Sequence, residues 1–184
     1  MKLKFLTIAA LLISTNAIAG NPQYISEIGR FNGVKSAPES YKLTCGECHF
    51  AYQAGLLPSK SWRELMLEDS LLDHFGESIT LNELETSETW GYLMHGAAEK
   101  SYYKTSSKIS RSIPDRFVPL RVTDTKYFKR EHRELKPRHV KLNPDVSSIS
   151  NCIACHTGAD SGSFEEDDIL IPNFGYWEAI EDDD

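Results

Sequence analysis

The sequence is poor in sulfur-containing residues and in long apolar runs. Its 184 residues include four cysteines and three methionines, and hydrophobic residues make up 40% of the chain, which is below the usual globular fraction. After residue 20, no segment is apolar over the roughly 20 residues that a membrane-spanning helix needs. The mature chain is therefore not expected to be an integral membrane protein. Its core should be thin, so that something other than polypeptide adds apolar volume.

Residues 142–184 lack lysine and arginine altogether. They hold 11 acidic residues, whereas residues 100–141 hold 13 basic residues against four acidic ones. The whole chain has a formal net charge of -7, which argues against nucleic-acid binding in an exported protein. We expect the basic middle to pair with buried anions or with an acidic docking protein, and the terminal acidic residues to be solvated.

The N-terminus has the pattern of a secretory signal peptide. Two lysines precede an apolar run over residues 5–13, and Ala17 and Ala19 are the small residues that signal peptidase recognises. We predict cleavage after residue 19, which leaves a soluble periplasmic protein that begins at Gly20.

Helical periodicity is strongest in the first half of the chain. One helix is expected over residues 60–77, with Gly76 as its C-terminal cap, and another over residues 80–100, with Thr80 and Glu83 as a capping box. Residues 101–148 lose this periodicity and contain four prolines, so they are expected to be mostly loop with one helical turn near residues 127–135. The sequence predicts a mainly α protein with a helical first half and an irregular, loop-rich second half.

Every cysteine belongs to a Cys-x-x-Cys-His motif, and none is left over. Two disulfides would give no reason for a histidine behind both pairs, and a zinc ribbon would not separate its pairs by more than a hundred residues. A redox dithiol needs a strand and a helix around it, which the polar flanks do not suggest. The residues concerned are Cys45, Cys48 and His49 in the first motif, and Cys152, Cys155 and His156 in the second.

Covalent haem accounts for both motifs. Two cysteines three positions apart lie on one turn and can both bond the vinyl groups at one edge of a porphyrin, while the following histidine binds the iron. We predict two covalently attached haem c groups, which also supply the apolar volume that the composition lacks. The first haem domain is expected over residues 20–105 and the second over residues 106–184, which includes the acidic tail.

The sixth ligand of each iron is the open question. Methionine would raise the haem potential and a second imidazole would keep it lower. With four histidines left for two positions, bis-histidine ligation is feasible, although spacing does not decide among them. The candidates are His74, His95, His132 and His139.

The chain resembles the bacterial dihaem cytochrome c family, DHC. The resemblance rests on "CGECHFAYQAGLLPSKSW", "LDHFGE", "RVTDTKYFKREHRE" and "NCIACHTGADSGSFEEDDILIP", in this order. It implies two bis-histidine haems, a first half similar to small class I cytochromes and a second half with little regular structure. Matched segment by segment, it implies distal ligands at His74 and His132, which leaves His95 and His139 as bystanders.

The expected function is electron transfer through two six-coordinate haems, without enzymatic activity. The resemblance implies redox partners such as a membrane cytochrome b as donor and a small oxygen-binding monohaem cytochrome as acceptor. The alternative is a dihaem peroxidase or reductase with one ligand-accessible haem, in which His95 or His139 would act as the distal acid-base group. The arginines expected to pair with haem propionates are Arg111, Arg116, Arg121 and Arg130.

Overall fold

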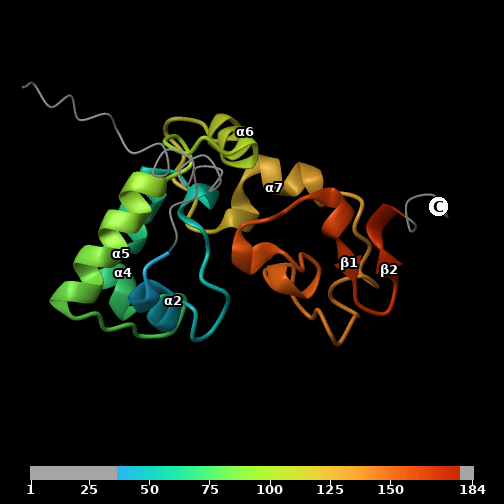
Figure 1. Ribbon diagram of the computed structural model, residues 1–184, viewed down its shortest axis with the longest axis horizontal. Coiled ribbons are helices and arrows are strands. Elements are labelled where there is room, and N and C mark those ends of the chain that lie inside the picture. The colour runs from blue at the N-terminus through green and yellow to red at the C-terminus, as the bar shows by residue number, and fades with distance from the viewer. Residues whose placement is uncertain (1–36, 179–184) are drawn as a thin grey trace, which may run out of the picture.

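The computed structural model describes residues 37–178. The predicted signal peptide and the last six residues, with the "EDDD" end, lie outside the described residues. Figure 1 shows α2, α4 and α5 gathered on one side, while loops, α7 and the short strands β1 and β2 form the other side. The prediction of a mainly α protein is confirmed.

The first half is built around one long helix, α5. This helix contacts α2, α3 and the short 3-10 helix η1, and buries Tyr92 and Leu93 against Tyr41, Leu57 and Trp62. The bounds of the elements are α2 Glu39–Cys45, η1 Ala54–Leu56, α3 Ser59–Leu65, α4 Glu68–Leu72 and α5 Glu83–Gly96.

The single helix predicted over residues 60–77 is wrong, because the structure has two short helices there. The chain breaks at Leu67, whose backbone is extended at φ −65° and ψ 144°. Trp62 of α3 is buried, whereas α4 buries no residue. The apolar residues that suggested one helix therefore do not lie on a single face that packs against the core. Gly76 caps no helix, since α4 ends at Leu72.

The second predicted helix is confirmed in α5, but its capping box is displaced by two residues. The Asn82 side chain accepts the amide N–H of Glu85 at 3.0 Å, and the Glu85 carboxylate accepts the N–H of Asn82 at 2.8 Å. Thr80 and Glu83 have the same spacing, and asparagine caps a helix at least as well as threonine. The pattern alone therefore did not distinguish the two pairs.

The second half contains more helix than its sequence suggested. Residues predicted to be loop form α6, which is polar but buries Ile109 and contacts η1 and α7. The predicted helical turn is present as α7, and β1 and β2 pair antiparallel with Leu170 opposite Tyr176. The bounds are α6 Lys104–Ser112, η2 Val122–Asp124, α7 Lys126–Glu131, η3 Cys152–Ala154, η4 Ala159–Ser161, η5 Glu166–Asp168, β1 Leu170–Ile171 and β2 Gly175–Tyr176.

Two clusters of buried side chains form the core. One belongs to the helices of the first half. The other joins Phe50 and Leu56 to Ile109 and Ala159, and so crosses the boundary predicted at residue 105. Tyr52 is among the side chains that pack against both clusters. The boundary between the two haem domains stays a prediction.

Candidate haem sites

The first Cys-x-x-Cys-His motif begins where α2 ends. Cys45 is the last residue of α2, and Gly46 donates its N–H to the carbonyl of Lys42 at 3.0 Å. A Cβ on Gly46 would overlap that carbonyl, so the tight turn requires glycine. His49 donates from Nδ1 to the carbonyl of Phe50 at 2.8 Å, which leaves Nε2 free to bind a metal.

His74 lies in a two-residue turn rather than at the end of a long helix. His74 donates its N–H to the carbonyl of Glu77 at 2.7 Å, and the two central residues, Phe75 and Gly76, have φ of 57° and 103°. Positive φ at both central positions defines a type I′ turn. The turn directs the His74 ring toward His49, with ring centroids 6.4 Å apart and the planes at 34°.

The second Cys-x-x-Cys-His motif is held by a 3-10 turn and by the C-terminal hairpin. Cys152 begins η3, and its carbonyl accepts the N–H of His156 at 2.8 Å. Leu170 donates its N–H to the carbonyl of Cys155 at 2.9 Å. The His156 ring also contacts Phe164, with centroids 5.3 Å apart. The hairpin thus fixes the loop that presents His156.

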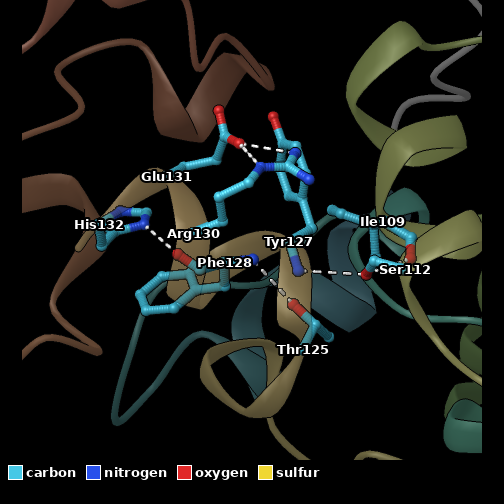
Figure 2. Close-up of polar contacts among 8 residues, drawn as sticks. All are labelled: Ile109, Ser112, Thr125, Tyr127, Phe128, Arg130, Glu131 and His132. Carbon is cyan, nitrogen blue, oxygen red and sulfur yellow. Dashed lines mark hydrogen bonds and ion pairs between the residues drawn. The ribbon is translucent and has the colours of Figure 1, made fainter.

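His132 is positioned by the last turn of α7. Thr125 caps α7 by accepting the N–H of Phe128 at 3.2 Å, and His132 donates from Nδ1 to the carbonyl of Phe128 at 2.9 Å, as Figure 2 shows. The ring of Phe128 stacks on His132, with centroids 3.9 Å apart and planes at 16°. Held in this way, His132 faces His156 with ring centroids 6.0 Å apart.

Burial keeps these imidazoles neutral. Burial first, and then the neighbouring His132, lower the pKa of His156 to about 4. Burial also lowers the pKa of His132, although its hydrogen bond to Phe128 acts in the opposite direction. Burial and then His49 lower the pKa of His74. Neutral imidazole is the form that binds a metal.

Burial acts in the opposite direction on the acidic side chains around the motifs. It raises the pKa of the Cys45 and Cys152 thiols to about 11. It also raises the pKa of Tyr52 to about 12, with Cys152 as the next cause. Burial therefore favours the neutral, protonated form of these three groups before haem is attached.

Two cavities adjoin the motifs. One of about 880 Å³ is lined by Cys152, Cys155, His156 and His132. The other, of about 1150 Å³, is lined by Cys48 and His49 but not by His74, and residues of the second half form its far wall. The first volume lies within the range of about 300–1,000 Å³ that is usual for ligand pockets, near its upper end, and the second lies above it.

The residues present fit haem at both positions. A metal that binds two imidazole nitrogens at about 2 Å each holds their ring centroids about 6 Å apart, which matches both facing pairs. The Nδ1 atoms of His74 and His156 are buried and have no hydrogen-bond partner within residues 37–178.

The other two candidate histidines lie elsewhere. His95 is exposed and donates from Nδ1 to the carbonyl of Gly91 on its own helix at 2.7 Å. His139 is buried with 1% exposure, and its ring meets Phe174 and Trp177 edge-on, at 4.9 and 6.2 Å between centroids. The choice of His74 and His132 over these two stays a prediction.

The arginines expected near propionates are spread over the second half. Arg121 lies over the ring of Phe75, 4.0 Å from its centroid, beside His74. Arg130 pairs with Glu131 at 2.7 Å (Figure 2), and Arg111 donates to the carbonyl of Ser107 on α6. Among the contacts of residues 37–178, none places Arg116 near either motif.

Sequence reasoning missed two aromatic residues of these sites, Tyr52 and Phe164. Tyr52 follows His49 by three positions, and its ring lies 5.0 Å from that of His49. This short spacing was the available signal for Tyr52. The contact of Phe164 with His156 depends on the path of the loop after η4, which periodicity does not reveal.

Two Cys-x-x-Cys-His loops, each facing a second imidazole in a mainly helical fold, define a c-type cytochrome with two haems. The comparisons with known proteins agree. The chain belongs to the dihaem cytochrome c family, whose family model matches residues 41–164. No curated protein matches the chain. Membership confirms the predicted family and its two covalently bound c-type haems.

Solved structures of diheme cytochromes are similar to the chain. A diheme cytochrome type c from Shewanella baltica OS155 is 34% identical, with a TM-score of 0.62, over 78% of this chain and 99% of that one. A diheme cytochrome c from Rhodobacter sphaeroides is 36% identical, with a TM-score of 0.61, over 71% of this chain and 99% of that one.

Within residues 37–178, every helix is too short or too polar to span a bilayer.

Proposed function

We propose that this protein is a periplasmic electron carrier with two six-coordinate, bis-histidine haems. His49 and His74 would bind the first iron, and His156 and His132 the second. The observation that carries the proposal is the pair of facing imidazoles at each motif, with ring centroids 6.4 and 6.0 Å apart. With two imidazoles bound to each iron, neither iron would have a vacant site for a substrate.

The chain anchors, orients and shields the haems. Cys45 and Cys48 would attach the first haem, and Cys152 and Cys155 the second. Backbone carbonyls fix one ring of each pair through Nδ1, which orients the metal-binding nitrogen and makes it more basic. When bound, each haem supplies a reversible one-electron couple at its iron. Because the ligands are held by hydrogen bonds and packing, they need not move when the charge of the iron changes.

The basic segment, residues 100–141, supplies cationic groups for the haem propionates and for partner proteins. Arg121 lies over the ring of Phe75, the residue after His74, and Arg130 precedes His132 by two residues on α7. From these positions we propose that their guanidinium groups pair with haem propionates. We propose redox protein partners, with a membrane cytochrome b as donor and a small oxygen-binding monohaem cytochrome as acceptor.

Electron paramagnetic resonance tests the proposal directly. The purified, fully oxidised protein should give two low-spin ferric signals and no high-spin signal, and added cyanide should bind slowly. A strong high-spin signal with rapid cyanide binding would instead identify one open iron. That result would favour a peroxidase or reductase with a ligand-accessible haem.

A further inference from the structure

The turn that carries His74 has an unusual residue at its first central position. Phe75 has φ of 57°, a left-handed conformation that type I′ turns usually give to glycine, asparagine or aspartate. A bulky side chain makes this conformation unfavourable. Phe75 is 49% exposed, so burial against the polypeptide offsets only part of that cost. Contacts of its aromatic ring are therefore needed to stabilise the turn.

The ring of Phe75 contacts one residue from each half of the chain. It meets the His74 imidazole edge-on, with centroids 4.8 Å apart and planes at 65°. The Arg121 guanidinium lies over the same ring, with its Cζ 4.0 Å from the centroid. A cation over an aromatic face is attracted by the negative charge of that face. One ring therefore connects the predicted distal ligand of the first haem with a residue of the second half.

Arg121 belongs to a well-fixed segment. It immediately precedes η2, and its carbonyl accepts the N–H of Asp124 at 3.1 Å. Two residues earlier, Pro119 is fully buried. At the start of the same segment, Lys60 of α3 donates to the carbonyl of Pro114 at 2.9 Å. Core packing and a contact from the first half thus hold the backbone that presents Arg121.

The segment around His74 receives less support from the polypeptide. None of residues 63–88 is buried. The hydrogen bonds around the turn are short-range, such as the one that Ile79 donates to the carbonyl of Leu71 at 2.8 Å. Regions with few buried contacts open at a low cost in free energy. A single contact with a fixed residue can therefore change how often this turn opens.

We propose that Arg121 is a positioning residue for His74, because its guanidinium group holds the Phe75 ring and so keeps the imidazole directed toward His49. This inference rests on the proposed binding of the first iron by His74. Opening of the turn separates Phe75 from Arg121 and lets an added ligand replace the imidazole at the iron. The guanidinium stacks by its planar face, which leaves its N–H groups available to a haem propionate.

The test is the rate at which cyanide binds to the oxidised protein, followed by absorbance and electron paramagnetic resonance. His74→Ala identifies the kinetic phase of the first haem, because it should make that phase fast. An exposed cation–π contact shifts an equilibrium by about two- to fivefold. Arg121→Gln should therefore accelerate the first-haem phase by about that factor and leave the second-haem phase unchanged.

Substitutions of the ring isolate the contact itself. Phe75→Leu should accelerate the same phase at least as much as Arg121→Gln, whereas Phe75→Tyr keeps an aromatic face and should react at the wild-type rate. In the Phe75→Leu protein, Arg121→Gln should have no further effect. This comparison separates the ring contact from any pairing of Arg121 with a propionate, since that pairing does not need Phe75.

The matched control is Arg116→Gln, which removes the same charge from an exposed position of the same segment and should leave the rate unchanged. An unchanged rate in Arg121→Gln would overturn the positioning role, and so would an equal acceleration by Arg121→Gln with and without the Phe75 ring. Failure of the proposed function has a different signature. If His74→Ala left both irons low spin, the proposed binding of the first iron by His74 would itself be wrong.

Discussion

Replacing His132 and His139 with alanine, one at a time, separates an iron ligand from a structural histidine. The two residues lie seven positions apart in the same basic segment, yet their surroundings differ. His132 faces His156 across 6.0 Å, whereas His139 is enclosed by Phe174 and Trp177. We expect opposite outcomes for the spin state and for the stability of the two variants.

The magnitudes follow from the contacts that each ring makes. His132→Ala removes one stacked aromatic contact and one hydrogen bond from a half-buried position, a loss of about 1–2 kcal/mol, and should convert one of the two irons to high spin. His139→Ala empties a fully buried position that makes two edge-on aromatic contacts and accepts a hydrogen bond from Arg138 at 3.0 Å. Its loss should be on the order of 2–4 kcal/mol, with both irons still low spin.

Electron paramagnetic resonance and chemical denaturation of the oxidised proteins measure the two effects independently. Added imidazole should restore the low-spin spectrum of His132→Ala, because it occupies the vacated coordination site. The exposed His95 provides the matched control, and His95→Ala should change neither quantity. A low-spin spectrum in His132→Ala together with a high-spin signal in His139→Ala would refute the assignment and make His139 the distal ligand.

Three further outcomes are expected. His74→Ala should convert the other iron to high spin, leave the second site low spin, and respond to added imidazole in the same spectroscopic assay. Asn82→Ala removes the hydrogen bond that the Asn82 side chain accepts from the N–H of Glu85 in the capping box of α5. It should lower the free energy of unfolding by about 1 kcal/mol in denaturant titrations, whereas Asn82→Asp should not. Burial raises the pKa of Tyr41 above its usual value. The unfolded chain therefore releases this proton first, and stability is retained below about pH 10 and decreases above it. Tyr41→Phe should flatten that alkaline decrease, and an unchanged slope would contradict the role of Tyr41.

Local features of the sites could be predicted from the sequence, and features that depend on packing could not. The Cys-x-x-Cys-His turns are local, so the spacing alone indicated haem attachment at Cys45 and Cys152. The helix break at Leu67 was hidden, because apolar residues recur through α3 and α4 although only α3 faces the core. Helix α6 was missed because it is polar and offers Ile109 as its buried apolar residue.

The candidate distal histidines show the same difference between what the local sequence predicts and what depends on packing. His74 and His132 matched family segments, but spacing did not separate His132 from His139. What distinguishes them in the structure is that the C-terminal hairpin brings Phe174 and Trp177 onto His139. The role of that part of the chain stayed open in the sequence, because an aromatic pair in an acidic segment does not reveal which side chain it will cover.

The cavity beside the second motif has a consequence for how the protein is made. If its 880 Å³ stayed open and dry, at about 24 cal/mol per Å³ the loss would be on the order of 20 kcal/mol, more than the roughly 5–15 kcal/mol that stabilises a typical domain. A chain without haem would gain free energy by closing this cavity or filling it with water, so we expect haem attachment to stabilise the second half of the fold. Before haem is attached, we expect this half of the chain to be the part most readily cut by proteases.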